Sequence, residues 1–391
     1  MQKKLFRNSK KYSLPMSKIN LLIAPNSFKE CADATEITAI IQNQFAENEF
    51  RVKSIPISDG GDGFLKICEN NFQLNIVTKD IQSFYDENYF QVPVGISNDR
   101  KQIFLESAEI IGMKKIPLEK RNPSILNSSN LGELLIKLGS EYPENSKIII
   151  GLGGTATNDL GLGLCVPFGL KLINAKGIEL PIQPKYFVDV STITLPERKI
   201  SIQIEVITDV EVPLFGQTGT SQTFAKQKGA TDKEIEILEK GVINVISIMK
   251  LEHGIDVASK LIGAGGGLLL GLSLIADLKI CFAEEFLLKK LKLEEEIRQT
   301  DFIITGEGAF DTQSMMKKGT GILINSAKKH QKKVFVICGK ADRSVSSSMD
   351  NGVRIFPLEK YFPTEEESIQ NYKIGIEKAC AEIKSYILSH P

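Results

Sequence analysis

The chain has 391 residues, with 48 basic and 48 acidic side chains and no net charge at pH 7. This length predicts two domains or one elaborated domain, and the ordinary contents of hydrophobic (42%) and charged (25%) residues exclude a disordered chain, a collagen-like fibre and a small disulfide scaffold. The balanced charge also argues against a protein that binds nucleic acid through a basic surplus.

The cysteines and histidines argue against several kinds of metal and catalytic site. The six cysteines are scattered and form no C-x-x-C pair, which argues against a structural zinc site and for free thiols in a reducing compartment. We therefore expect a cytoplasmic protein. With three histidines, one of them next to the C-terminus, a histidine-based triad or a tri-histidine metal site is nearly excluded.

Neither the basic N-terminal segment nor the most apolar segment of the chain has the pattern of a membrane span or a secretory signal. Residues 1–15 carry five basic side chains without the apolar core of a secretory signal, so we expect a flexible basic arm. Residues 261–276 hold no charge, but they are too few to span a bilayer and include five glycines. The triple glycine within them is more typical of a backbone turn.

In chain order, short apolar runs alternate with helix signatures. Asp33 with Glu36, Thr231 with Glu234, and Thr364 with Glu367 have the spacing of helix starts, the last of them opening the final helix. Buried strands are predicted at 19–24, 147–150, 301–305, 334–338 and 353–356. This alternation predicts an α/β fold with a largely parallel sheet.

Two segments have a different pattern. Residues 74–105 and 171–210 contain short apolar runs separated by turns, which indicates antiparallel strands and a second, smaller domain. We expect a discontinuous Rossmann-like domain of residues 18–63, 125–163 and 286–391. The second, mixed α/β domain would comprise residues 64–124 and 164–285.

Ligands of parallel α/β sheets bind beyond the carboxyl ends of the strands. The segments that follow the predicted strands are rich in glycine, small residues and carboxylates: 25–29, 58–63, 151–159, 208–209 and 305–311. Each alone could be a tight turn or a helix cap. Together they are hard to explain by folding needs.

The known nucleotide-binding motifs fit these segments poorly. Gly151, Gly153 and Ala156 fit the G-x-G-x-x-A of a dinucleotide fold, but no acidic residue closes a following strand at the expected distance of ~20 residues. A Walker A loop and a protein-kinase catalytic loop are absent.

Phosphoryl transfer explains the whole set, because it needs backbone donors and cations for phosphates, carboxylates for Mg²⁺ and a base near the acceptor hydroxyl. A hydrolase that uses Mg²⁺ would need similar carboxylates. The candidate carboxylates are Asp59, Asp62, Asp159, Asp209, Glu307 and Asp311. The candidate cations are Lys29, Lys226, Lys228 and Lys318, and the candidate backbone donors are the glycines of 151–154 and 263–267.

From residue 21 to the end, the chain resembles the type-1 glycerate kinases, which phosphorylate glycerate with ATP. The motifs that carry the resemblance are I-A-P-N-S-F-K at 23–29, D-G-G-D-G at 59–63, E-S-A at 106–108, G-E-L at 132–134, I-G-L-G-G-T-A-T-N-D at 150–159, D-V at 209–210, Q-K-G-A-T at 227–231, G-A-G at 263–265 and I-T-G-E-G at 304–308. So many motifs in one order make chance similarity improbable.

The resemblance implies a two-domain α/β enzyme that uses ATP and Mg²⁺ and has its site between the domains. It assigns phosphate charge to Lys29 and Lys318, and Mg²⁺ binding or the acceptor's proton to Asp209 and Glu307. Ser27, Asn158 and Asp159 would bind the acceptor, D-glycerate. The backbone cradle would be Gly151, Gly153, Gly154, Gly263 and Gly265. The expected catalytic residues are Lys29, Asp209 and Glu307, and the expected metal ligands are Asp59, Asp209, Glu307 and Asp311.

The chain departs from the family pattern around segments expected to contact the acceptor: Glu30, residues 127–131, Val212 and Lys317. Three alternatives therefore stay open: a kinase of another small hydroxy acid, an NAD-dependent oxidoreductase and a catalytically silent sensor. The phosphorylated hydroxyl is also open, with 2-phosphoglycerate favoured over 3-phosphoglycerate by the resemblance. We expect a monomer or homodimer that binds neither nucleic acid nor membrane.

Overall fold

The computed structural model describes residues 18–28, 31–86, 88–256, 262–312, 314–315, 318–342 and 352–390. The predicted arm of residues 1–15 lies outside these residues, as do Lys29, Glu30 and Lys317.

A parallel five-stranded sheet is built from the two ends of the chain, in the order β14-β13-β12-β1-β2. Its strands are β1 (Ile19–Ile23), β2 (Phe50–Ser54), β12 (Phe302–Phe310), β13 (Lys333–Ala341) and β14 (Val353–Pro357). All of its pairings are parallel, as the alternation of strands and helices predicted.

Alternate residues of these strands face opposite layers of helices. Leu21 and Ile23 of β1 pack with α1 (Ala34–Gln44) and α13 (Tyr372–Ser389), whereas Leu22 packs on the other face with α9 (Leu293–Gln299) and α10 (Gly319–Lys329). This period of two explains why the strand is apolar throughout: both of its faces are buried.

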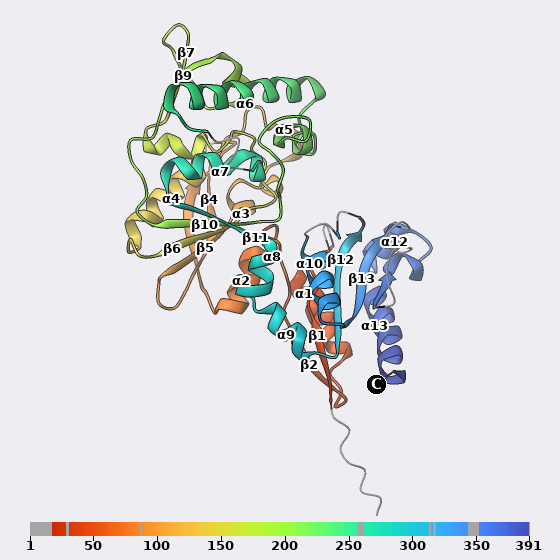
Figure 1. Ribbon diagram of the computed structural model, residues 1–391. Helices are drawn as coiled ribbons and strands as arrows, with labels where there is room; N and C mark the ends of the chain where they lie inside the picture. The colour runs from red at the N-terminus through yellow and green to blue at the C-terminus, as the bar shows by residue number, and fades with distance from the viewer. Residues whose placement is uncertain are drawn as a thin grey trace, which may run out of the picture.

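The central part of the chain forms a mixed six-stranded sheet, in the order β11-β10-β6-β5-β4-β3 (Figure 1). Its strands are β3 (Asn75–Gln82), β4 (Tyr89–Ile96), β5 (Gln102–Glu106), β6 (Lys147–Gly151), β10 (Gln203–Thr208) and β11 (Leu278–Phe282). The predicted antiparallel strands of 74–105 are confirmed by the β3–β4 and β4–β5 pairings.

β6 lies in a different sheet from the one that the predicted grouping of residues 125–163 with 18–63 implies. It pairs in parallel with β5 and β10, not with β1. A strand that is apolar on both faces carries no mark of which sheet it joins, and this is why the sequence misplaced it. The domain boundaries themselves stay a prediction.

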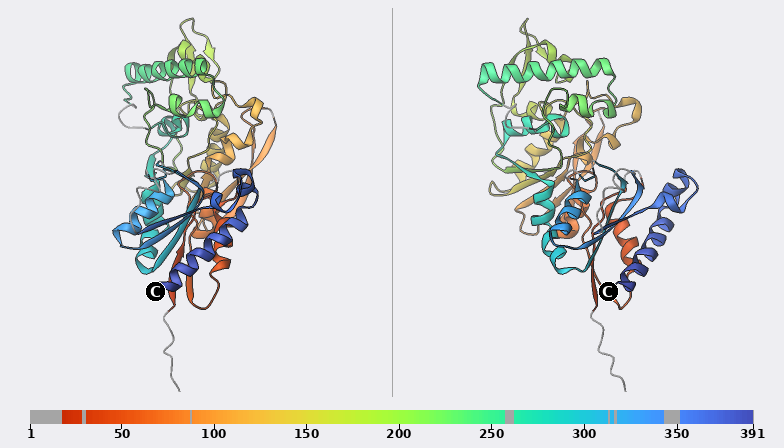
Figure 2. Two further views of the ribbon diagram at one scale, coloured as in Figure 1. Left: turned by 90° about the vertical axis from the view of Figure 1, so that its right-hand side faces the viewer. Right: turned by 45° about the vertical axis from the view of Figure 1, so that its right-hand side comes forward.

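The remaining elements cover the six-stranded sheet. Within 171–210, β7 (Lys171–Asn174), β8 (Glu179–Leu180) and β9 (Val190–Thr194) form an antiparallel sheet of their own. The helices of this part are α3 (Ser107–Ile111), α4 (Ser129–Glu141), α5 (Thr220–Phe224), α6 (Asp232–His253) and α7 (Ala264–Ile275), with short 3-10 turns η1 (Met113–Lys115), η2 (Leu118–Lys120), η3 (Gly163–Phe168), η4 (Pro184–Asp189) and η5 (Lys226–Lys228). In both Figure 1 and Figure 2, α6 lies at the end of the molecule farthest from the five-stranded sheet.

The helix starts follow the predicted capping residues. Asp33 accepts the N–H groups of the first turn of α1, and Thr231 forms a reciprocal capping box at the start of α6. Thr364 caps α12 (Glu365–Gln370) instead of the final helix, because a break at Asn371 separates α12 from α13. Before α12 lies η7 (Leu358–Tyr361).

Two connections cross between the sheets and share one core. The first runs from β2 through α2 (Phe64–Phe72) to β3, and the second from β11 through α8 (Ala283–Glu285) and the π-helix η6 (Phe286–Lys290) to α9. A single hydrophobic cluster joins Leu22 of the parallel sheet, Phe64 and Phe286 of the two connections, and Ile149 and Ile207 of the mixed sheet. The loops at the strand ends are therefore held close together.

In the part of the chain that the structure describes, no helix combines the length and apolar character that crossing a membrane requires.

Candidate active site

The loop of residues 58–63 lies where the two sheets meet. It follows β2 and opens α2, and it packs against the ends of β6 and β10. A Cβ added to Gly60 would lie 2.5 Å from the Ile207 carbonyl oxygen, and one added to Gly153 would lie 2.5 Å from the Gly61 Cα. Only glycine allows these backbones to approach so closely. The structure thus brings together two of the predicted loops.

Glu106, at the end of β5, anchors this loop through hydrogen bonds to its last residue and to the start of α2. Its two carboxylate oxygens accept the backbone N–H groups of Gly63 (2.8 Å) and Leu65 (3.0 Å) at the start of α2. Burial raises the pKa of Glu106 to about 7, although these two hydrogen bonds oppose the rise. In the sequence Glu106 stands out only as part of the E-S-A motif at 106–108, and no role was predicted for it.

Glu307 is the predicted catalytic residue with the most unusual surroundings. Its Oε1 is buried and has no hydrogen-bond partner among the described residues. Burial raises the pKa of Glu307 to about 7, and the charge of Asp59 adds to this, whereas the hydroxyls of Thr320 and Ser314 and the charge of Lys318 lower it. Asp59 and Lys318 therefore lie close enough to Glu307 to act on its charge in opposite directions, and their roles in a reaction stay predictions.

The backbone around Glu307 differs from the expectation. Residues 305–311 were predicted to form a loop, but β12 continues to Phe310 and pairs with β13 beyond Glu307. The glycines of this stretch suggested a loop, yet a Cβ at Gly306 would overlap the Ile337 carbonyl of the neighbouring strand. Glycine is required here by a close strand approach.

Asn158 and Asp159 are not exposed to a ligand in this structure. Both side chains are fully buried. Asp159 accepts hydrogen bonds from the N–H and hydroxyl of Ser128 (both 2.8 Å) and from the N–H groups of Gly161 (3.2 Å) and Gly163 (3.0 Å). Burial raises its pKa against these four bonds. In this geometry Asp159 links the loop at Ser128 to the segment 161–163. Its contact with the acceptor or a metal stays a prediction.

The predicted glycine cradle divides into packed and accessible parts. A Cβ at Gly151 would overlap the Phe64 ring, and one at Gly263 would lie 2.6 Å from the Pro213 carbonyl oxygen. Residues 265–267 all have left-handed φ and pack against the 152–160 segment. Gly154 is exposed and Gly153 half-buried, and the N–H of Gly153 donates to the Ser107 hydroxyl at 3.2 Å, so Gly154 offers the more accessible backbone beside the 58–63 loop.

The other predicted residues occupy strand and helix ends. Asp209 is half-buried directly after β10, Lys318 is half-buried at the start of α10, and Ser27 is half-buried before α1. Asp311 accepts the backbone N–H of Ser314 at 2.9 Å and so forms a turn after β12. Lys29 lies outside the described residues.

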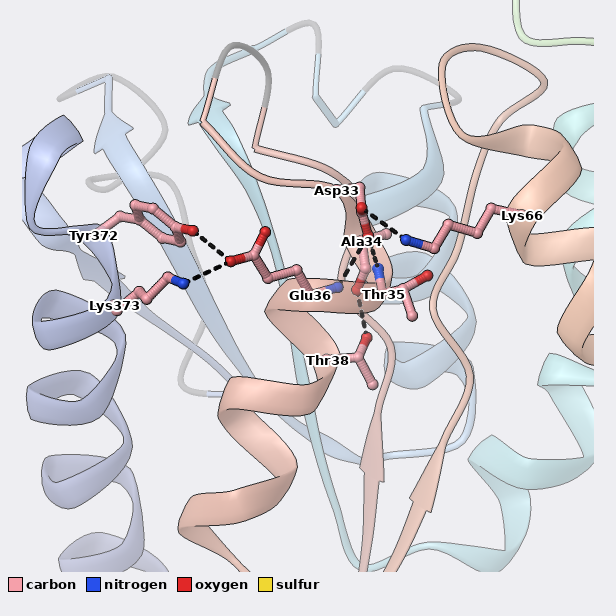
Figure 3. Close-up of polar contacts among 8 residues, drawn as sticks. All are labelled: Asp33, Ala34, Thr35, Glu36, Thr38, Lys66, Tyr372 and Lys373. Atoms are coloured by element: carbon pink, nitrogen blue, oxygen red, sulfur yellow. Dashed lines mark hydrogen bonds and ion pairs between the residues drawn. The ribbon is translucent and has the colours of Figure 1, made fainter.

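The start of α1 is fixed from both sides (Figure 3). Lys66 of α2 donates to the carboxylate of the cap residue Asp33 at 3.0 Å. On the other side Tyr372 of α13 donates its hydroxyl to Glu36 at 2.6 Å. These contacts tie the helix that follows the 25–29 segment to both neighbouring helices.

Among the described residues, no three histidine, cysteine or acidic side chains converge into a metal-binding cluster. Mg²⁺ bound with a nucleotide keeps several waters and needs only one or two carboxylates besides the phosphates. The unpartnered Oε1 of Glu307 and the nearby Asp59 fit such a partial ligand set.

A dinucleotide fingerprint requires a strand that leads directly into a helix. Residues 152–162, all of which the structure describes, form no helix after β6. The structural context of the G-x-G-x-x-A interpretation is therefore missing.

The chain matches the glycerate kinase family over residues 21–388. Relatives include "Glycerate 2-kinase" of Escherichia coli, 31% identical over 86% of this chain and 89% of its own, and "Glycerate kinase" of Bacillus cereus, 31% identical over 93% and 97%. A crystal structure assigned as a glycerate kinase 2 from Salmonella typhimurium LT2 has a TM-score of 0.72 and 27% identity, and the alignment covers 95% of this chain and 100% of that one. The order of motifs, the two sheets and these similarities lead to one conclusion: the protein is an enzyme of the glycerate kinase family.

Proposed function

We propose that the protein transfers the γ-phosphoryl group of ATP to D-glycerate and that the product is 2-phosphoglycerate. The buried Oε1 of Glu307 carries the proposal: it has no hydrogen-bond partner among the described residues and could accept a proton, and burial raises the pKa of Glu307 to about 7, as suits a general base at neutral pH. The name of the Escherichia coli relative supports the choice of the 2-hydroxyl.

In this proposal Glu307 accepts the proton of the acceptor hydroxyl. The hydroxyl oxygen forms a bond to the γ-phosphorus, and the bond between that phosphorus and the bridging oxygen of ADP breaks. Lys318, which already acts on the charge of Glu307, would face the phosphate together with Lys29. The exposed backbone N–H of Gly154 would donate to a phosphate oxygen, and the N–H of Gly153 would do so by exchanging its present acceptor, the Ser107 hydroxyl.

Mg²⁺ would be held by Asp59 and Asp209, with Asp311 as a further predicted ligand, because this proposal uses the carboxylate of Glu307 as the base and not as a metal ligand. The packing of Gly60 on Ile207 supports this choice, because it brings the residue after Asp59 next to the strand end that precedes Asp209. When bound, the metal neutralises negative charge on the transferring phosphoryl group. The free state of all six cysteines supports a reducing, cytoplasmic location.

An ADP-release assay tests the proposal. With Mg²⁺ and ATP, the purified protein should release ADP with D-glycerate and much less with L-glycerate, glycolate or lactate. Coupling to enolase identifies the product, because enolase consumes 2-phosphoglycerate and not 3-phosphoglycerate.

Three results would contradict it. Equal ADP release without any acceptor would indicate an ATPase. Thermal stabilisation by ligands without ADP release would indicate a silent sensor. Saturable binding of NAD and none of ATP, followed by fluorescence, would indicate an oxidoreductase.

A further inference from the structure

A buried polar cluster lies directly behind the accessible glycines of the 151–159 segment. Gly153 and Gly154 reach the surface, whereas every residue from Thr155 to Asp159 is buried. A buried stretch that carries two threonines, an asparagine and an aspartate needs polar partners from elsewhere in the chain.

Lys228, the last residue of η5, supplies one of these partners. It is only 4% exposed, and its Nζ donates to the Thr157 carbonyl oxygen at 2.7 Å and to the Thr155 hydroxyl at 3.3 Å. Burying an ammonium group is unfavourable, and burial lowers the pKa of Lys228 to about 8, an effect that the charge of Asp159 opposes. Lys228 was predicted as a candidate cation for phosphate, but its ammonium group is buried and bonds Thr155 and Thr157.

The cluster contains buried polar atoms that have no hydrogen-bond partner among the described residues. The Asn158 amide donates to the Ser221 hydroxyl at 3.0 Å, while Asn158 Oδ1 and Thr157 Oγ1 are buried and have no hydrogen-bond partner among the described residues. An apolar side chain of similar size could fill the place of Lys228 without any desolvation of charge. The hydrogen bond from the buried Lys228 to a backbone carbonyl is therefore better explained by a need to fix the geometry of the loop than by a gain in the stability of the fold.

The loop is fixed at its other end as well. The N–H of Ala156 donates to the Ile111 carbonyl oxygen at 2.8 Å, and the N–H of Leu160 donates to that of Gly266 at 3.0 Å. Lys228 adds a bond to the Thr157 carbonyl, between these two anchors, and one to the Thr155 hydroxyl, just before the first. Because Gly153 packs against Gly61, a shift of the loop would also disturb the segment that carries Asp59.

We propose that Lys228 is a positioning residue for phosphoryl transfer: its ammonium group bonds the Thr157 carbonyl and the Thr155 hydroxyl, and so keeps Gly153 and Gly154 in place beside the loop of residues 58–63. The inference rests on the proposed kinase function. It assigns Lys228 no contact with substrate.

The variant Lys228→Met tests this, because methionine has a similar length and no charge or donor. We expect kcat per folded molecule to fall about 100-fold, the scale of a small misplacement of reacting groups, with KM for D-glycerate changed by less than about threefold. Hydrogen exchange of residues 155–160 should become several-fold faster. Lys233→Met is the control, since Lys233 is an exposed lysine of α6 and should keep the parent kcat and exchange.

A second variant covers the case in which Lys228→Met does not fold. Thr155→Val removes the hydroxyl that contacts Lys228 but keeps the shape of the side chain, and it should lower kcat and speed exchange to a smaller extent. Parent kcat and parent exchange in the folded variants, or a lowered melting temperature as the only change, would overturn the proposal.

The exchange measurement also separates this inference from the proposed function. If the parent protein phosphorylates no hydroxy acid, the kinase proposal fails, while faster exchange confined to 155–160 would still support the positioning of the loop by Lys228. Unchanged exchange in an active parent and its variants would overturn the inference alone.

Discussion

The rings of Phe64 and Phe286 pack with their centroids 5.4 Å apart, and each ring belongs to a different connection between the two sheets. Phe64 opens α2 directly after the 58–63 loop, and Phe286 opens the π-helix η6. Both side chains are almost fully buried. The contact therefore stabilises the junction on which the candidate active site is built.

Replacing Phe286 by alanine should destabilise the protein strongly. The change removes a buried ring and leaves a cavity, so we expect the free energy of unfolding to fall by about 3–5 kcal/mol. Urea denaturation followed by circular dichroism measures this. Phe282→Ala is the control, because Phe282 is 38% exposed and its loss should matter much less. Equal losses for the two variants would show that the junction has no special weight.

Glu307→Gln should abolish most activity and yet stabilise the protein at alkaline pH. Loss of a general base lowers turnover by about 100-fold or more. The raised pKa of Glu307 means that the folded state holds this proton more tightly than the unfolded chain, so the contribution of Glu307 to stability falls as pH rises from 4.5 to about 7. Glutamine stays neutral and removes this loss.

The stability of parent and Glu307→Gln protein should therefore be compared at pH 5 and pH 8. The variant should gain up to about 3 kcal/mol relative to the parent at pH 8 and little at pH 5. A variant that loses both activity and stability at pH 8 would indicate that Glu307 has a structural role only.

Glu106→Ala should loosen the 58–63 loop. It leaves the buried N–H groups of Gly63 and Leu65 without their acceptor, which costs about 1–3 kcal/mol for each such group. Unfolding at pH 6 and faster hydrogen exchange at residues 63–65 would report the loss. Glu109→Ala, which removes a half-buried carboxylate paired with Lys115, is the control, and a similar effect there would argue against a specific anchor.

Much of the fold could be predicted because it depends on local signals. Asp33 and Thr231 satisfy the first N–H groups of their helices, and this requirement is visible in the spacing of the side chains. The assignment of β6 to a sheet was not predictable, because Ile148 and Ile149 face two different cores and either sheet would bury them equally. Sheet membership depends on long-range pairing.

The site could be predicted in its residue types but not in its exposure. Asp59 and Lys318 lie close enough to Glu307 to act on its charge, whereas their predicted roles stay predictions. Asp159 was expected to face a ligand, but it is buried and accepts four hydrogen bonds from donors in two separate loops. A motif shows which chemistry is available and does not show which of its side chains point inward.

Asp209→Asn decides whether the carboxylate at the end of β10 takes part in the reaction. Asp209 is half-buried directly after Thr208, and the 58–63 loop packs on the same strand end at Ile207. Asparagine keeps the shape and most hydrogen bonds of aspartate but removes its charge and basicity. If Asp209 binds Mg²⁺ or accepts the proton, turnover should fall ~100-fold or more with little change in melting temperature.

The matched control is Asp277→Asn. Asp277 lies at the opposite end of the same sheet, is exposed and accepts a hydrogen bond from the Gln203 amide at 2.6 Å. It should leave turnover unchanged. Varying the Mg²⁺ concentration then separates the two roles of Asp209: a lost metal ligand raises the Mg²⁺ concentration needed for half-maximal rate, whereas a lost base lowers the rate at every concentration. An asparagine variant as active as the parent would limit Asp209 to shaping the turn before Pro213, and the metal and the proton would then have to be handled by Asp59, Glu307 and Asp311.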